Sequence, residues 1–285
     1  MNAIRIRILP ALVIVFWLSG AGYVSADELG GEILQEAEYL AEWVSFYASF
    51  DKGADADYAK GDPKKLEPDM PVTQGEGIAG KGLKVTYVRE KTGKGATATI
   101  PVSLPVGYKL EGNLFPQAGA ISLWLKVLPG NIDNSWFFYA GSPRYNFALF
   151  AQTKEFVGGV VMQHICSGRL AEPWQAGEWH HVAATWRGNI GALYCDGKKL
   201  AETTKGARIS NGTVLTIPEL FQGVNDFWIG AFRRAGTSGF RLGLSAEYDE
   251  LIIFSRDLAE YDVGLLYRLG KEGSAFGPLL DKPGK

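Results

Sequence analysis

The sequence predicts an all-β sandwich or jelly roll with a short helix near each end of the chain. Residues 179–186 carry apolar side chains on both faces of one extended segment, which is typical of a strand in the middle of a packed sheet. Many other short segments alternate in the same way and are separated by turns that contain Gly, Pro or Asn. Helical spacing of apolar residues appears before residue 43 and after residue 256.

The first 26 residues read as a cleavable signal peptide. Arg5 and Arg7 precede an apolar run at 8–18, and Val24-Ser25-Ala26 forms a small-residue cleavage site before Asp27. The run is too short for a membrane span. We therefore expect a secreted or periplasmic mature protein with no membrane span.

The charge balance argues against a nucleic-acid partner. Without Arg5 and Arg7, 27 of the 29 basic residues remain against 31 acidic ones. The chain is mildly acidic and has no basic cluster beyond Arg233-Arg234, so it lacks the basic patch of a nucleic-acid-binding surface.

The two cysteines, Cys166 and Cys195, would meet oxidising conditions after export, so a disulfide is open to them. If segments 156–165 and 192–195 flank 179–186 on opposite sides, the two sulfurs lie about two strand spacings apart, beyond disulfide reach. The sequence therefore favours two small buried thiols.

The chain begins, after the signal peptide, with an amphipathic helix over residues 27–42 and a first strand over 44–50. Residues 51–76 form a long loop that we expect to be either functional or held down by other residues. Strand patterns then follow at these segments: 83–87, 98–100, 121–127, 136–140, 146–150 and 156–165.

The central strand leads into a hairpin. Residues 192–195 are followed by Asp196-Gly197, which suits a tight turn, and by a return strand at 198–202. Strands at 227–232 and 247–254 come next, and a helix at 257–269 closes the fold. For that helix we expect Asp257 as N-cap, Glu260 in a capping box and Gly270 as the stop.

Six segments in this order resemble the laminin G-like jelly-roll domains of the concanavalin A-like lectin/glucanase superfamily. They are Phe50-Asp51 and residues 77–83, 119–126, 177–202, 227–230 and 248–267. The resemblance covers about residues 43–270 and implies a two-sheet antiparallel β-sandwich. It divides the chain into a signal peptide (1–26), a helical segment (27–42), the jelly roll (43–270) and a tail (271–285). A fold hosts many functions, so the resemblance implies no single one.

The resemblance also implies a metal site. In similar domains an Asp on each of the first and last strands helps to hold a structural calcium ion beside backbone carbonyls. Asp51 and Asp249 match those positions, and Gly80 is a candidate carbonyl donor. Calcium accepts such oxygen ligands in flexible geometry. The alternative is that the carboxylates are paired with Lys or Arg or are exposed.

Enzymes share this fold, so the acidic residues are candidates for a catalytic pair. Retaining glycosidases set two carboxyls about 5 Å apart. Glu247, Asp249 and Glu250 are the candidate cluster, but strict alternation turns Glu250 away from Asp249, and the next positions on the Asp249 face are apolar. The sequence therefore assigns no catalytic residue.

Histidines and aromatic residues supply the other candidates. His180 and His181 point to opposite faces and cannot jointly bind one metal with His164. Trp136, Tyr139 and Trp174 lie outside the framework pattern, and an exposed ring can stack on a sugar. Packing in the core is the alternative for each of the three.

These observations favour a secreted, non-catalytic, lectin-like module that binds a glycan or an extracellular protein, with calcium as a structural ion. A polysaccharide hydrolase or lyase of the same fold is the first alternative. A structural cell-envelope component, with the helix at 27–42 docking a partner, is the second.

Overall fold

The computed structural model describes residues 26–67, 69–91, 97–129, 135–142, 144–152, 159–232 and 243–281. Apart from Ala26, the predicted signal peptide lies outside these residues. The helices are α1 (Ala26–Ala37), η1 (Glu38–Trp43), η2 (Ile217–Phe221), α2 (Glu260–Lys271) and η3 (Gly277–Leu279). The strands are β1 (Val44–Ala48), β2 (Tyr58–Ala59), β3 (Thr73–Glu76), β4 (Lys81–Lys91), β5 (Thr97–Ser103), β6 (Val106–Lys109), β7 (Ala118–Val127), β8 (Ser135–Gly141), β9 (Asn146–Gln152), β10 (Gly159–Met162), β11 (Cys166–Arg169), β12 (Trp179–Arg187), β13 (Ile190–Cys195), β14 (Lys198–Thr203), β15 (Ala207–Arg208), β16 (Val214–Leu215), β17 (Asp226–Ile229) and β18 (Ala246–Phe254).

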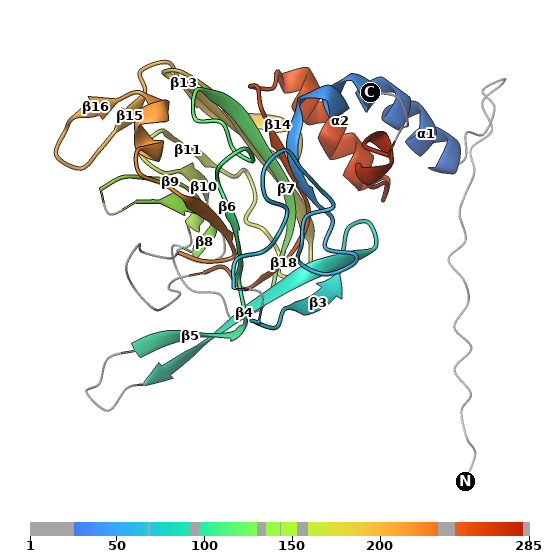
Figure 1. Ribbon diagram of the computed structural model, residues 1–285, viewed down its shortest axis with the longest axis horizontal. Helices are drawn as coiled ribbons and strands as arrows, with labels where there is room; N and C mark the ends of the chain where they lie inside the picture. Colours follow the sequence, from blue (N-terminus) through green and yellow to red (C-terminus); the bar gives the residue numbers. More distant parts are fainter. Residues whose placement is uncertain are drawn as a thin grey trace, which may run out of the picture.

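The strands form two stacked antiparallel sheets, as predicted (Figure 1). Sheet A runs β14-β13-β12-β7-β18-β1-β2, with β4 also paired to β18 and with β3 and β5 paired to β4. Sheet B runs β11-β10-β9-β8-β17-β6. The first and last strands are neighbours, because Ala48 of β1 pairs with Leu251 of β18. This pairing brings the beginning and the end of the jelly roll together in sheet A.

Strand β12 lies in the interior of sheet A, between β7 and β13. Its Val182, Ala184 and Trp186 face the core between the sheets, where Trp186 lies 5.0 Å from Phe147, centroid to centroid. Its Ala183 faces the opposite side. Burial on both faces explains why the segment shows no polar face in the sequence.

Helices α1 and α2 lie side by side against the outer face of sheet A (Figure 1). Three α1 and η1 side chains, Ile33, Ala37 and Leu40, are buried in this layer. The apolar face of the N-terminal helix is thus used inside the molecule, and in this arrangement it is not free to dock a partner. Phe276 and Leu279 are also buried there, so residues 271–281 contribute to this layer.

The boundaries of the second helix differ from the prediction. Helix α2 starts at Glu260, and the Asp262 carboxylate accepts the Ala259 N–H at 2.9 Å, which caps its first turn. Asp257, the predicted cap, instead binds the Arg187 side chain. Gly270 lies inside the helix rather than at its end, and Gly273, with φ of 69°, follows the last turn.

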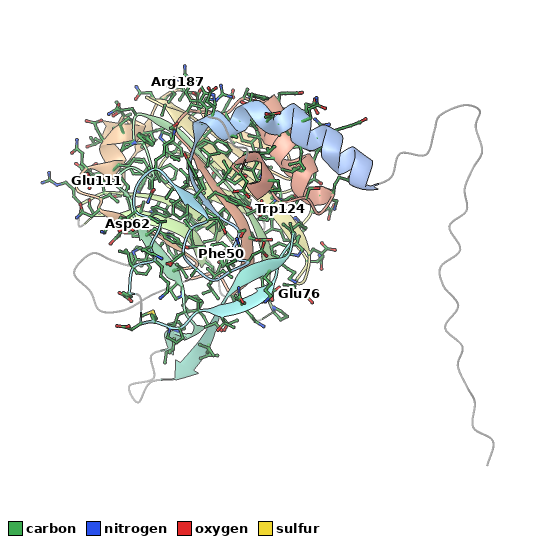
Figure 2. All side chains as sticks on the ribbon, turned by 45° about the vertical axis from the view of Figure 1, so that its right-hand side comes forward. Phe50, Asp62, Glu76, Glu111, Trp124 and Arg187 are labelled. Atoms are coloured by element: carbon green, nitrogen blue, oxygen red, sulfur yellow. The ribbon has the colours of Figure 1, made fainter. Side chains whose placement is uncertain are left out.

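Hydrogen bonds fix the long segment 51–76 to the rest of the protein. The Asp57 carboxylate accepts hydrogen bonds from the backbone and hydroxyl of Ser49, each at 2.8 Å, and the Asn113 side chain accepts the Gly61 N–H at 3.0 Å. At its two ends, Phe50 points into the body and Glu76 lies at the solvent edge of β3 (Figure 2). Within the described ranges, no helix combines the length and apolar character of a membrane span.

Candidate functional site

The predicted calcium ligands gather around one tight turn, residues 77–81. The Asp51 carboxylate accepts the Lys81 N–H at 2.7 Å, and the Asp249 carboxylate accepts the Ala79 N–H at 3.1 Å. The Gly80 carbonyl accepts the Gly77 N–H at 3.0 Å within the turn. The structure therefore places the three predicted residues at one turn.

Their arrangement holds a turn rather than a closed cation site. Both Asp249 oxygens face backbone N–H donors, since Glu250 N donates to Oδ1 at 2.8 Å and Ala79 N to Oδ2. Among the described residues, no three His, Cys, Asp or Glu side chains cluster as a metal site. Calcium takes six to eight oxygens, so these three residues would supply only part of its coordination shell.

Asp249 is nevertheless an unusual carboxyl. It is fully buried, and burial, followed by the nearby Glu250 charge, raises its pKa to about 8. Glu250 is 4% exposed, and burial raises its pKa to about 7. No salt bridge to Asp249 exists in the described part of the chain. A buried acid without a basic partner is held in its neutral form at neutral pH.

The position of Glu250 corrects the strict alternation assumed from the sequence. The register of β18 against β7 shifts between Asp249 and Ile252, and Glu250 has φ of 49°, so a bulge interrupts the strand. The bulge turns Glu250 toward the helices, where it accepts the Tyr47 hydroxyl at 2.6 Å and the Phe276 N–H at 2.7 Å.

The acidic cluster does not face an open groove. Glu247 is 7% exposed and ion-paired with Lys126 at 2.5 Å, while Asp249 is buried against the 77–81 turn and Glu250 against the segment that follows α2. A polysaccharide therefore has no access to Asp249 and Glu250 in this arrangement.

The histidines separate to opposite faces of β12, as predicted. His181 is buried on the helix side, where its Nε2 lies 2.8 Å from the Ser122 hydroxyl. His180 Nδ1 lies 2.9 Å from the Asp196 carboxylate, and its ring stacks on Trp174. His164 occupies the turn between β10 and β11 with φ of 66°. The three do not form one site.

Both cysteines are free thiols, but the predicted arrangement of their strands on opposite sides of β12 was wrong. Strand β10 lies in sheet B and does not flank β12, whose neighbours are β7 and β13. Burial raises the pKa of Cys166 to about 11 and that of Cys195 further, so neither is a reactive thiolate.

Trp174 belongs to the core. It is 2% exposed and stacks on His180 with 4.8 Å between ring centroids. A ring that binds a sugar by stacking must expose one face. Its burial removes Trp174 from the candidate site.

Trp136 and Tyr139 lie together on the outer face of sheet B, with Phe150 and Phe232 beside them. Trp136 lies 5.2 Å from Phe150 and 5.4 Å from Phe232, and Phe232 lies 4.6 Å from Tyr139, centroid to centroid. We call these four rings the aromatic patch. Both α-helices of the described chain pack on sheet A, away from this face (Figure 1).

Only part of the patch reaches solvent. Trp136, Phe150 and Phe232 are half-buried, whereas Tyr139 is 3% exposed because Phe232 covers it edge-on. Tyr139 therefore supports the patch from below rather than contacting a ligand. This corrects the prediction that Tyr139 itself stacks on a sugar.

Polar groups surround the rings. Ser167 and Arg169 on β11 alternate with the inward-facing Cys166 and Gly168, so they share the outer face and are exposed. Asn146 pairs with Gly141 at the far end of the patch. The buried Trp136 Nε1 and Asn146 Oδ1 have no hydrogen-bond partner among the residues that the structure describes. Unpaired polar atoms beside half-buried rings are unusual in a purely structural surface.

Sequence reasoning missed Phe150 and Phe232. Phe150 could have been found, because it lies four residues after Asn146 in the same strand and therefore on the same face. Phe232 could not, since it follows β17 and no periodic pattern relates it to Trp136.

Comparison with known proteins agrees with this architecture. Residues 101–261 match the family model Laminin_G_3, described as the concanavalin A-like lectin/glucanases superfamily. Domain 4 of AbnA, an extracellular arabinanase from Geobacillus stearothermophilus solved with arabinotriose, is 17% identical with a TM-score of 0.47, and the alignment covers 79% of this chain and 99% of that one. No curated protein matches the sequence.

Two further solved structures are longer than this chain. The Trypanosoma rangeli sialidase in complex with DANA is 12% identical with a TM-score of 0.49, over 85% of this chain and 38% of that one. A mutant of HCR/D is 11% identical with a TM-score of 0.50, over 81% of this chain and 52% of that one. At such identities the likeness extends to the fold alone. The family match covers more than half of the 285 residues, and the chain therefore belongs to the concanavalin A-like lectin/glucanase superfamily as a laminin G-like, two-sheet sandwich.

Proposed function

We propose that this is an exported, non-catalytic glycan-binding module whose binding surface is the aromatic patch on sheet B. The observation that carries the proposal is the row of half-buried rings on the sheet face that the helices leave open. Sugars offer C–H faces to aromatic rings and hydroxyls to polar groups. Trp136 and Phe150 supply the first kind of contact, and Ser167, Arg169 and Asn146 lie within the same face to supply the second.

A panel of soluble and insoluble polysaccharides tests the proposal. Trp136→Ala removes the central ring, and we expect a loss of affinity of about 5- to 150-fold for any glycan that binds, since truncating one central stacking ring costs about 1–3 kcal/mol. Trp43→Ala is the matched control, because Trp43 is 38% exposed and lies in the helical layer.

Far-UV circular dichroism confirms that both variants fold. The proposal fails if the wild-type protein binds no polysaccharide of the panel, or if the Trp43 variant loses as much affinity as the Trp136 variant. Release of reducing ends or of unsaturated sugar by the wild-type protein would favour the hydrolase or lyase alternative instead.

Calcium binding at the 77–81 turn is a separate proposal. Its support is the buried Asp249 carboxyl, which has no ion-pair partner among the described residues. Asp51, Asp249 and the Gly80 carbonyl would hold the ion, and the ion would keep both carboxyls charged. A rise in melting temperature with 1 mM calcium over EDTA, abolished by Asp249→Asn, supports it; equal melting temperatures for the wild-type protein reject it.

A further inference from the structure

Strands β4 and β5 form an arm that extends beyond the two stacked sheets (Figure 1). Only the base of β4 belongs to the body, where residues 83–85 pair with β18. Strand β5 pairs with β4 alone, so among the described residues its other edge carries unpaired backbone N–H and C=O groups. An unpaired edge is a template for another strand.

One face of this arm is apolar and exposed. Val88 of β4 pairs directly with Ile100 of β5, and their side chains are 42% and 40% exposed. Val102 lies two residues beyond Ile100 on β5, at the register shift between the two strands, and is 62% exposed. Three of the large apolar side chains that reach solvent in the described chain therefore lie close together on the arm, and exposed apolar patches of this kind mark interaction sites.

The charge distribution indicates which partner fits. The seven residues of β5, Thr-Ala-Thr-Ile-Pro-Val-Ser, contain no charged side chain, whereas β4 carries Lys81, Lys84, Arg89, Glu90 and Lys91. Natural edge strands are usually protected by charge, and this one is not. In antiparallel pairing of two β5 strands the charged β4 strands lie on the two outer edges, so no like charges face each other across the contact.

We propose that the arm is a homodimerisation element, in which β5 of one copy pairs antiparallel with β5 of a second copy about a two-fold axis. The pairing makes a continuous four-stranded ribbon whose apolar face joins Val88, Ile100 and Val102 of both copies. Such a contact is self-complementary, as two-fold interfaces must be. Because Pro101 has no N–H, the hydrogen-bonded pairing centres on residues 97–100.

The mass of the mature protein in solution tests the inference. Light scattering coupled to size exclusion should give about twice the chain mass at tens of micromolar protein, unchanged in 0.5 M salt because the contact is uncharged. Ile100→Lys and Val102→Lys should each halve that mass. Both positions are exposed, so these substitutions leave the fold intact. Val214→Lys, at a site 57% exposed on β16, is the matched control and should remain dimeric.

A cross-link locates the axis. Thr99→Cys should give an interchain disulfide under mild oxidation, whereas Val214→Cys should not. A wild-type monomer at hundreds of micromolar overturns the inference. So does a dimer that Ile100→Lys and Val102→Lys leave intact, or one that salt dissociates. None of these outcomes depends on whether the protein binds a glycan.

Discussion

At the scale of single residues, the bulge at Asp249 and Glu250 is the most unusual feature of the chain. A non-glycine residue with positive φ costs free energy and persists only when its surroundings fix it. Glu250 is fixed by its carboxylate, which joins Tyr47 of β1 to the backbone of Phe276 after α2. One strained, buried acid therefore ties sheet A to the C-terminal segment.

This pair of acids predicts a dependence of stability on pH. A carboxyl whose pKa is raised by folding stabilises the protein fully below its unfolded pKa, and that stabilisation is lost as the pH rises through the folded pKa. The folded pKa values are about 8 for Asp249 and about 7 for Glu250. Burial lowers the pKa of His181 from 6.5 to about 4. The effect of His181 on stability has the opposite sign and is confined to pH values below 6.5.

Between pH 6.5 and 8 we therefore expect the free energy of unfolding in EDTA to fall by about 2 kcal/mol. Urea denaturation at four pH values measures it. Asp249→Asn removes the ionisable group at this position and should abolish most of the fall in the free energy of unfolding with pH. A wild-type stability that rises or stays constant over this range would show that the two carboxyls are not held neutral.

At the scale of elements, α2 shows how a glycine can serve close packing rather than helix termination. A Cβ at Gly270 would lie 2.3 Å from the Trp124 indole nitrogen. Trp124 cannot move aside, because Tyr267 of the same helix stacks on it at 5.7 Å. Figure 2 places Trp124 on sheet A, next to the helical layer. The helix approaches the sheet this closely only because residue 270 has no side chain.

Gly270→Ala should therefore lower the free energy of unfolding by about 1–3 kcal/mol, through overpacking. Gly264→Ala in the same helix is the control. Nothing lies within 4 Å of the Cβ that it would add, so alanine should stabilise the protein by up to about 1 kcal/mol. Thermal melts of both variants give the comparison. Equal shifts in the same direction would contradict the packing argument.

At the scale of the whole molecule, the helical layer and the outer face of sheet A bury one common interface. Helices α1 and α2 cover Ala120, Ala183 and Ile252 on the outer face of sheet A, and Leu40 of η1 is fully buried among them. A layer that depends on the sheet for its buried surface should not unfold separately.

Leu40→Ala should lower the free energy of unfolding of the entire protein by about 2–5 kcal/mol, because it leaves a cavity. Leu34→Ala, at a half-buried position of α1, should cost less than half as much. Far-UV and near-UV circular dichroism should give the same midpoint for each variant. Separate midpoints would mean that the helices form an independent unit, as a partner-docking segment would require.

The sandwich class could be predicted from local alternation of apolar residues and from turn residues such as Asp196-Gly197, which act over a few positions. The grouping of Asp51, Gly80 and Asp249 was expected only from the resemblance to laminin G-like domains. The helix at the chain's start was also predictable, because Ile33, Ala37 and Leu40 are spaced for one face.

Only the tertiary structure decided which sheet holds β10, on which side Glu250 points, and which aromatic rings are exposed. Alternation tells which residues share a face of a strand, but not which sheet the strand joins or what covers that face. Trp174 and Trp136 look alike in sequence, yet one stacks on His180 in the core and the other lies half-buried on the outer face of sheet B. The difference arises because burial is set by contacts between segments far apart in the chain.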